Sequence, residues 1–238
     1  MRILVTNDDG INSKGIIALA EMASKLGDVY VVAPEGECSA MAHHISVRNV
    51  LLAKNHDFPI PVKKAVSISG TPADCVKIAL AHLLDFKPDY VFSGINNGYN
   101  AGCDILYSGT VGAAMEGLAG GVKAMAFSNK ANSSYDILDR YLLDVTKQAI
   151  ERDIPAGHIL NINFPGGSLD DYKGTLWDRK IAPFQYFKDI YDIKETEEGT
   201  QFLAGGIVTK ESIELDDTDM GAVMNGYISI GLIRCNVF

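Results

Sequence analysis

Short apolar runs that alternate with helix-like segments are the feature that most constrains the fold of this chain. Residues 2–6 (RILVT) form the first run, apolar residues at helical spacing follow from Ser13 to Gly27, and residues 28–34 (DVYVVAP) form the next run. Such runs are typical of strands that are buried on both faces of a parallel sheet. A strand, a helix and a second strand in this order predict a right-handed βαβ unit.

The same alternation continues to about residue 165. Thr71, Pro72 and Asp74 are typical of a helix start, with Thr71 as the N-cap, and this helix is expected to reach about Leu84. The segments expected after it are strand 89–94, helix 108–120, strand 122–128, helix 133–152 and strand 158–164. The sequence therefore predicts a doubly wound, Rossmann-like parallel sheet in a three-layer α/β/α arrangement.

Two parts of the chain depart from this alternation. Residues 47–69 contain two strand-like runs around a proline-containing turn, which predict a hairpin insertion. Beyond Pro165, the segments TLWDRKIA, TQFLAGGIVTK and YISIGLIRCNVF look like strands joined by acidic loops. We therefore expect residues 1–165 to form the α/β core and residues 166–238 to form a smaller β-rich extension, an accessory and oligomerisation region packed on the core.

Composition excludes several kinds of partner. The 238 residues carry a formal net charge of −9, with no basic stripe to neutralise a phosphate backbone, so long nucleic acid is not an expected partner. No apolar run approaches the roughly 20 residues of a membrane span, and the N-terminus lacks the pattern of a signal peptide. The four cysteines are scattered without CxxC spacing. These features predict a cytoplasmic protein with reduced thiols.

Polar side chains follow three of the expected strands. Asp8 and Asp9 come directly after the first strand, and Ser39 lies in the loop after the second, together with His43 and His44. Adjacent carboxylates repel one another unless they are protonated or bridged by a cation, and hard oxygen ligands suit Mg²⁺, Mn²⁺ or Ca²⁺. Because ligands bind at the carboxyl ends of parallel strands, these loops are candidates for a metal site.

The third strand end adds amides and an anion site. Asn96, Asn97 and Asn100 lie among glycines after strand 89–94, and amide oxygens can complete the shell of a hard metal. Ser108 then opens a helix whose first N–H groups favour an anion. Each loop alone also has a structural interpretation, namely a turn or helix cap at Asp8 and Asp9, an N-cap at Ser108, and solvated or structural histidines. Their coincidence at three strand ends favours a functional site.

At these residues the chain resembles the SurE survival-protein nucleotidases. The blocks that carry the resemblance are MRILVTNDDG, GTPADCV at 70–76, SGINNGYNAGCDILYSGTVGAAMEG at 93–117, NINFP at 161–165 and TDMGAVMNGYISI at 218–230. They span essentially the whole chain in the order of that family. One departure lies near Ser39, where the family usually carries a glycine and this chain has Ala42.

The resemblance implies a site and an activity. It implies one divalent metal ion per subunit, Mg²⁺ or Mn²⁺, and release of phosphate from nucleoside 5'-monophosphates, with 3'-monophosphates and short polyphosphate as further substrates. It also implies a homodimer or homotetramer with an exchanged C-terminal region. The implied metal ligands are Asp8, Asp9, Ser39 and Asn96. The implied phosphate contacts are Asn100, Ser108, Gly109 and Thr110.

The expected chemistry is attack on phosphorus by a water that the metal activates. Asp8 and Asp9 are the candidate catalytic residues, and the sequence leaves open which of them acts as base or nucleophile. Two rival classes remain. The first is a module without turnover, either a phosphoacceptor receiver or a nucleotide-binding module, and the second is a nucleotide-binding dehydrogenase. A receiver needs a further aspartate after a central strand, but the third strand here ends in Ser93 and Gly94. The dehydrogenase lacks GxGxxG after the first strand.

Overall fold

A computed structural model describes residues 1–208 and 213–235 of the chain. The strands are β1 (Arg2–Thr6), β2 (Asp28–Pro34), β3 (Ala53–Asn55), β4 (Lys64–Ile68), β5 (Tyr90–Asn97), β6 (Lys123–Asn129), β7 (His158–Phe164), β8 (Gly174–Leu176), β9 (Phe187–Thr196), β10 (Gly199–Val208) and β11 (Tyr227–Arg234). The helices are α1 (Lys14–Ser24), α2 (Pro72–Ile78), α3 (Gly109–Ala119), α4 (Asp136–Glu151) and α5 (Asp219–Met224), with a π-helical turn η1 (Ala79–Leu83) and the 3₁₀ turns η2 (Gly102–Tyr107) and η3 (Leu169–Asp171).

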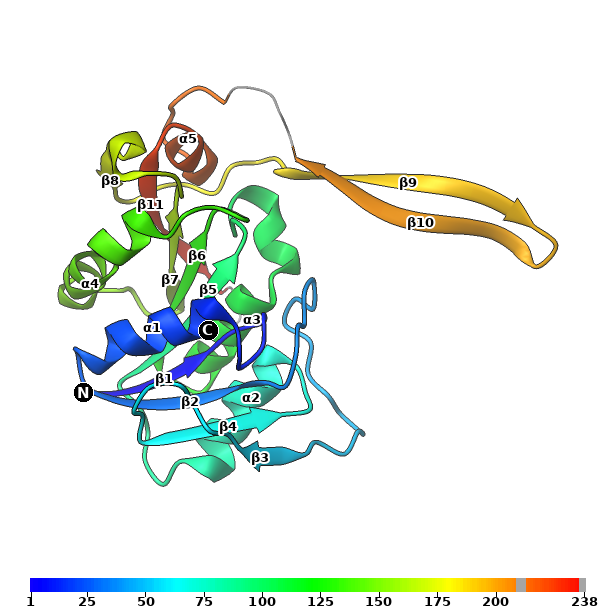
Figure 1. Cartoon of the computed structure of the whole chain (residues 1–238). Helices are drawn as coiled ribbons and strands as arrows, with labels where there is room; N and C mark the ends of the chain where they lie inside the picture. The colour runs from blue at the N-terminus through cyan, green and yellow to red at the C-terminus, as the bar shows by residue number, and fades with distance from the viewer. Residues whose placement is uncertain (209–212, 236–238) are drawn as a thin grey trace.

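Nine strands form one central sheet in the order β3-β4-β2-β1-β5-β6-β7-β11-β8 (Figure 1). The run from β4 to β7 is parallel throughout, while β3 is antiparallel to β4 and β11 is antiparallel to β7. The chain leaves β1 toward β2 on one side and later returns to β5 on the other side. This reversal is the topological switch point, where a doubly wound sheet binds its ligands. The predicted fold class is confirmed.

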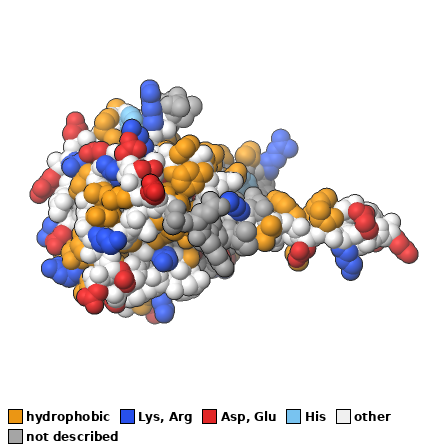
Figure 2. Space-filling view, turned by 90° about the horizontal axis from the view of Figure 1, so that it is seen from above, with side chains coloured by type: hydrophobic (Ala, Val, Ile, Leu, Met, Phe, Trp, Pro, Cys, Tyr) orange, Lys and Arg blue, Asp and Glu red, His pale blue; other side chains and the backbone are white. Residues whose placement is uncertain are grey.

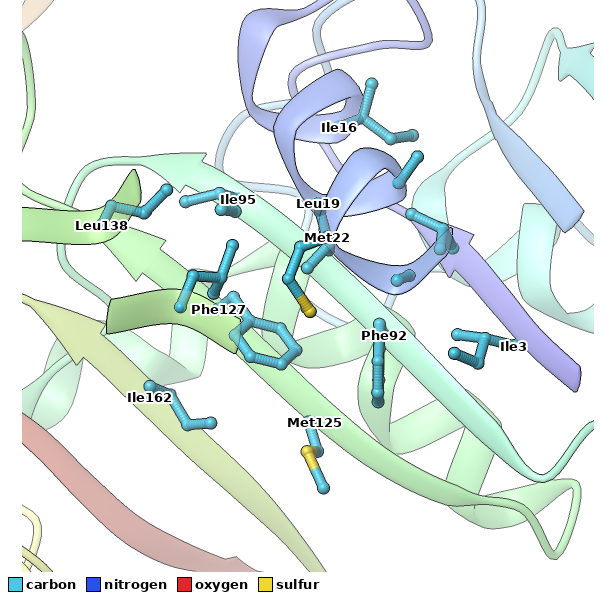
Figure 3. Packing of buried hydrophobic residues seen from close by; sticks show 14 of the residues in the cluster. Ile3, Ile16, Leu19, Met22, Phe92, Ile95, Met125, Phe127, Leu138 and Ile162 are labelled. Carbon is cyan, nitrogen blue, oxygen red and sulfur yellow. The ribbon is translucent and has the colours of Figure 1, made fainter. Parts of the chain in front are cut away.

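Helices cover both faces of the sheet because alternate residues of each strand point to opposite sides. Ile3 and Val5 of β1 pack in one hydrophobic cluster with α1 and α4, whereas Leu4 packs in a second cluster with α2 and α3. Figure 3 shows Met22 of α1 pointing toward the layer that holds Phe92 of β5 and Phe127 of β6, all members of the first cluster. Because both faces of the sheet are buried, nearly every residue of a central strand is apolar, which explains the continuous apolar runs in the sequence.

Side chains at the helix starts explain where α1 and α2 begin. The Ser13 hydroxyl accepts a hydrogen bond from the Ile16 N–H over 3.4 Å. At α2 the Thr71 hydroxyl accepts from the Asp74 N–H over 3.1 Å, while Asp74 Oδ2 accepts from the Thr71 N–H over 3.0 Å. This reciprocal pair is a capping box, with Pro72 at the first helical position. The predicted start of this helix is confirmed.

The sheet contains strands from both parts that depart from the alternation. The predicted hairpin appears as β3 and β4, and β4 also pairs in parallel with β2, so the hairpin extends the central sheet. Near the other end, β11 pairs with β7 and with β8. The short helix α5, which the sequence pattern did not predict, precedes β11 and packs against it. The division at residue 165 stays a prediction.

A hairpin arm projects from this body. It consists of β9 and β10, which pair only with each other among the described strands and extend away from the central sheet (Figure 1). Several of its apolar side chains face solvent, since Ile193 is 64% exposed, Phe202 63% and Leu203 70%. Figure 2 shows hydrophobic side chains along the inner part of the arm and charged side chains toward its tip. No described helix combines the length and apolarity needed to cross a membrane.

Candidate functional site

A cleft of about 480 Å³ lies at the switch point, where β1, β2 and β5 reach their carboxyl ends. It is the place that the fold offers for a ligand, and it gathers residues from the three loops after β1, β2 and β5 and from the base of the arm. The residues that line it are Asp8, Asp9, Glu37, Ser39, Ala40, Asn96, Asn97, Gly98, Tyr99, Asn100, Asp104, Tyr107, Ser108, Gln185 and Phe187. All four predicted metal ligands, and the predicted phosphate contacts Asn100 and Ser108, lie in this lining.

Asp8 lies at the bottom of the cleft against the start of α3. Its side chain accepts two hydrogen bonds from Thr110, one from the N–H over 3.0 Å and one from the hydroxyl over 2.5 Å. The approach is close at Gly109, where a Cβ would lie 3.0 Å from the Asp8 side chain. Burial raises the pKa of Asp8 to about 6, against the lowering effect of the Thr110 bonds. A carboxylate with two bonded oxygens still has lone pairs for a further ligand.

Asp9 lines the same cleft, and the carboxylate of Glu37 lies near it. Its Oδ2 accepts from the Asn97 N–H over 3.1 Å. Burial raises the pKa of Asp9, and the nearby charge of Glu37 raises it further. Glu37 also accepts a hydrogen bond from the Ser39 hydroxyl over 2.7 Å. The loop after β1 is thus bonded to the loop after β5, and the loop after β2 places its Glu37 carboxylate near both.

A bulge in β5 brings Asn96 to the cleft. The pairing of β5 with β6 shifts its register between Ser93 and Asn96. Helix α1 packs so closely here that a Cβ on Gly15 would lie 1.9 Å from the Ile95 carbonyl oxygen, so only glycine fits at position 15. The Asn96 amide nitrogen donates to the Gly98 carbonyl over 2.9 Å. This bond leaves the amide oxygen of Asn96 available as an acceptor.

The loop that carries Ser39 is fastened to α3. The Ala42 N–H donates to the Tyr107 carbonyl over 3.0 Å, and Gly112 of α3 lies so close that a Cβ there would be 2.2 Å from the Ala42 carbonyl oxygen. His43 then contacts Glu116 of α3, with 2.8 Å between Nε2 and Oε2. The His43 bond, with a smaller effect of Lys77, lowers the pKa of Glu116. His43 therefore serves as an anchor of this loop.

At the start of α3, some backbone N–H groups bond to other residues of the protein and one remains for a ligand. The first N–H groups of a helix have no partner within it. Those of Thr110 and Val111 are bonded to Asp8 and to the Ser108 hydroxyl, over 3.0 and 3.1 Å. The Gly109 N–H therefore remains without a partner among the described residues. Thr110 is fully buried with both donors on Asp8, so it lies behind the cleft, whereas Ser108 lines it.

The donor chemistry of the cleft fits a hard divalent cation. Asp8, Asp9 and Glu37 bring carboxylates together, Ser39 and Asn96 add neutral oxygens, and no Lys, Arg or His belongs to the described lining. Carboxylate, hydroxyl and amide oxygens are the ligands that Mg²⁺ and Mn²⁺ prefer. Within residues 1–208 and 213–235, no three His, Cys, Asp or Glu side chains form a group that could hold a metal ion, in the cleft or elsewhere. The fit to a cation therefore rests on the two aspartates together with the hydroxyl and amide oxygens.

Several residues of the cleft were not singled out from the sequence. Glu37 lies in the same loop as Ser39, and only the fold shows that it lines the cleft close enough to Asp9 for its charge to act on that carboxylate. Tyr107, 53% exposed, precedes the Ser108 cap and also lines the cleft. Gln185 and Phe187 come from the base of the arm, in a part of the chain that was expected to be accessory. No local pattern marks these two residues, because the long-range packing of the arm places them.

Fold and site together define the class: a doubly wound α/β protein with an acidic, oxygen-lined cleft beside a helix N-terminus at the switch point. The family model described as "Survival protein SurE" matches residues 3–183. The chain therefore belongs to the SurE family, as its sequence blocks predicted.

Individual relatives agree with this assignment. The chain is 37% identical over 234 residues to a protein of Christiangramia forsetii named 5'-nucleotidase SurE, covering 96% of this chain and 88% of the relative. A protein of Moorella thermoacetica with the same name is 41% identical over 235 residues, with 97% and 88% covered. The crystal structure of the Sure protein from Aquifex aeolicus matches with a TM-score of 0.83 and 32% identity, covering 100% of this chain and 95% of that one.

Proposed function

We propose that this chain is a metal-dependent 5'-nucleotidase that releases inorganic phosphate from nucleoside 5'-monophosphates. The observation that carries the proposal is the meeting of the Asp8 and Asp9 carboxylates with the N-terminus of α3 in one cleft. Membership of the SurE family and relatives named 5'-nucleotidase SurE support it. Nucleoside 3'-monophosphates and short polyphosphate are proposed as further substrates.

The proposed cofactor is one divalent cation per subunit, Mg²⁺ or Mn²⁺. Asp8, Asp9, Ser39 and Asn96 are the residues proposed to hold it, and the presence of all four in the lining of the cleft supports this. When bound, such a cation neutralises charge on a phosphate and lowers the pKa of a coordinated water. The same cation would stabilise the ionised form of the two aspartates, whose pKa values are raised mainly by burial and further by neighbouring carboxylates.

The residues of the chain have separate proposed tasks. Asn100, Ser108 and the Gly109 N–H would bind the phosphate group, with the positive end of the α3 dipole behind them. For Thr110 we propose the role that its hydrogen bonds support, which is to orient Asp8. Either Asp8 or Asp9 would accept the proton of the attacking water.

The proposed assembly is a homodimer or homotetramer. The arm formed by β9 and β10 supports this proposal, because its apolar side chains are exposed in the single chain. Several exposed apolar side chains on one projecting element are typical of a site of protein association. The cytoplasmic location predicted from the sequence remains a prediction.

The test is phosphate release from a panel of nucleoside 5'- and 3'-monophosphates with Mg²⁺, with Mn²⁺ and with a chelator. We expect turnover that needs the cation and that falls at least about 1,000-fold in Asp9→Asn, a loss in the range of a missing catalytic group. Asp57→Asn is the control, since Asp57 is an exposed acid outside the cleft. No release from the parent with either cation would reject the proposal and favour a binding module without turnover.

A further inference from the structure

Two asparagines of the NINFP motif have no part in the site described so far. Asn161 and Asn163 lie two residues apart on β7, so their side chains leave the same face of the strand. Asn161 is 4% exposed and Asn163 is 1% exposed, and neither belongs to the lining of the cleft. A buried amide costs free energy unless its donors and acceptor find partners. Their partners therefore indicate what they do.

Both side chains bond to the backbone of Asn100. Asn163 Oδ1 accepts from the Asn100 N–H over 2.9 Å, and its Nδ2 donates to the Asn100 carbonyl over 3.0 Å. Asn161 Nδ2 donates to the same carbonyl over 2.7 Å. The Asn163 amide thus pairs with a peptide group as a neighbouring strand would, at a point beyond the end of β5 where the sheet offers no such partner.

The Asn100 side chain is fixed from behind as well. Its Nδ2 donates to the Ser128 hydroxyl of β6 over 2.8 Å. An asparagine amide nitrogen carries two N–H groups, so a second donor remains for a ligand. Asn100 is 5% exposed and lines the cleft, whereas Ser128 is fully buried behind it. Three side chains from β6 and β7 therefore determine both where Asn100 lies and how its amide is turned.

We propose that Asn163, assisted by Asn161 and Ser128, is a positioning residue that holds Asn100 in the geometry for binding the phosphate group of the substrate. This inference rests on the proposed function, in which Asn100 contacts phosphate. We call Ser128, Asn161 and Asn163 the Asn100 clamp. The clamp acts on binding of phosphate and does not act on the proposed cation ligands, because none of its hydrogen bonds involves Asp8, Asp9 or Ser39.

The test compares Asn163→Leu with Ser229→Ala. Ser229 faces Asn163 across the β11–β7 pair and is 1% exposed, and its hydroxyl has no hydrogen-bond partner among the described residues. For Asn163→Leu we expect the KM for nucleoside 5'-monophosphate and the Kd for inorganic phosphate, measured by calorimetry with Mg²⁺, to rise about tenfold or more. The Mg²⁺ concentration that half-saturates the increase in Tm should stay within about twofold of the parent's. Ser229→Ala should match the parent in all three.

A purely structural role for Asn163 predicts another pattern, in which Tm falls while phosphate affinity of the folded protein matches that of Ser229→Ala. That result would overturn the inference. If Asn163→Leu does not fold, Ser128→Ala decides, because it removes only the hydroxyl that holds the Asn100 amide. A rise of about threefold or more in the phosphate Kd supports the clamp, and an unchanged Kd rejects it.

The same measurements separate this inference from the proposed function. A parent protein that binds inorganic phosphate but hydrolyses no nucleotide would remove the nucleotidase proposal, while the Kd values would still decide on the clamp. A parent protein that neither hydrolyses nucleotides nor binds phosphate would overturn both.

Discussion

Thr110 donates both its N–H and its hydroxyl to the carboxylate of Asp8, although the two residues lie 102 positions apart in the chain. The two bonds tie the end of β1 to the first turn of α3 and set the direction of the Asp8 oxygens. The helix start that faces the cleft and the carboxylate at its bottom are thereby held as one unit.

Replacing Thr110 by valine keeps the shape and the backbone bond but removes the hydroxyl bond to Asp8. We expect turnover to fall by about 10- to 100-fold, because a misplaced catalytic group loses rate steeply. Thr146→Val is the matched control, since Thr146 is an equally buried threonine whose hydroxyl bonds to the Leu142 carbonyl within α4. Steady-state rates at saturating Mg²⁺ check this prediction. Equal rates for the two variants would contradict the orienting role.

The raised pKa of Asp8 predicts how stability changes with pH in the presence of a chelator. A rise from 3.8 to about 6 means that the folded chain favours protonated Asp8. This contribution, worth about 3 kcal/mol, is complete below about pH 4 and is lost as the pH rises through about 6. Asp8→Asn cannot ionise, so its free energy of unfolding relative to the parent should increase by about that amount between pH 4 and pH 7. Urea unfolding at each pH measures this free energy. Parallel plots of the free energy of unfolding against pH for the parent and Asp8→Asn would contradict the prediction.

Ala42 has a backbone conformation that favours glycine, with φ at +51°. A non-glycine residue there is strained by about 1–2 kcal/mol, while glycine increases the freedom of the unfolded chain. We therefore expect Ala42→Gly to leave the free energy of unfolding unchanged or to raise it by up to about 1 kcal/mol. Ala18→Gly, at a half-buried position inside α1, should lower it by about 1 kcal/mol. Equal losses in both variants would show that Ala42 is not strained.

The contact of His43 with Glu116 predicts a specific effect on cation binding. His43→Ala frees the Ser39 loop from α3, so we expect the Mg²⁺ concentration for half-maximal rate to rise by about three- to tenfold. The rate at saturating Mg²⁺ should change by less than about twofold. Lys77→Ala is the control, because Lys77 contacts the other oxygen of Glu116 at 3.3 Å without touching the loop. A similar rise in the half-maximal Mg²⁺ concentration in both variants would show that the change at Glu116, and not release of the Ser39 loop, weakens cation binding.

The exposed apolar side chains of the arm predict how the chain assembles. Phe202→Asp combined with Leu203→Asp should convert the proposed oligomer to a monomer of 25.7 kDa, because association would bury these side chains. Gln201→Asp, an exposed position on the same strand, should leave the mass of the parent unchanged. Light scattering after size-exclusion chromatography measures the mass. An oligomer that survives the double substitution would exclude the arm as its main contact.

Much of the core was predictable because local rules and burial agree there. Strands such as β1 and β6 are apolar on both faces, and Thr71, Pro72 and Asp74 mark the start of α2 by their own hydrogen bonds. The polar residues that follow the strands were expected near one another because carboxyl ends of parallel strands share an edge. The structure does bring Asp8, Asp9, Ser39 and Asn96 into one cleft.

The parts that the sequence did not predict depend on long-range contacts. Strand β9 projects from the body, so no core imposes an apolar face on it, and α5 has only six residues. The parallel pairing of β4 with β2 joins segments about thirty residues apart and has no local signature. The roles of Thr110 and Asn163 were hidden for the same reason, since each acts on a residue more than sixty positions away.

The acidic lining of the cleft also sets an order of events. A phosphate dianion that approaches the cleft before a cation meets Asp8, Asp9 and Glu37, with no Lys, Arg or His in the described lining to attract it. Under the proposed function, the cation therefore enters first or together with the nucleotide. Such a compulsory order would tie the working rate of the protein to the free divalent cation concentration around it, even where nucleotide is abundant.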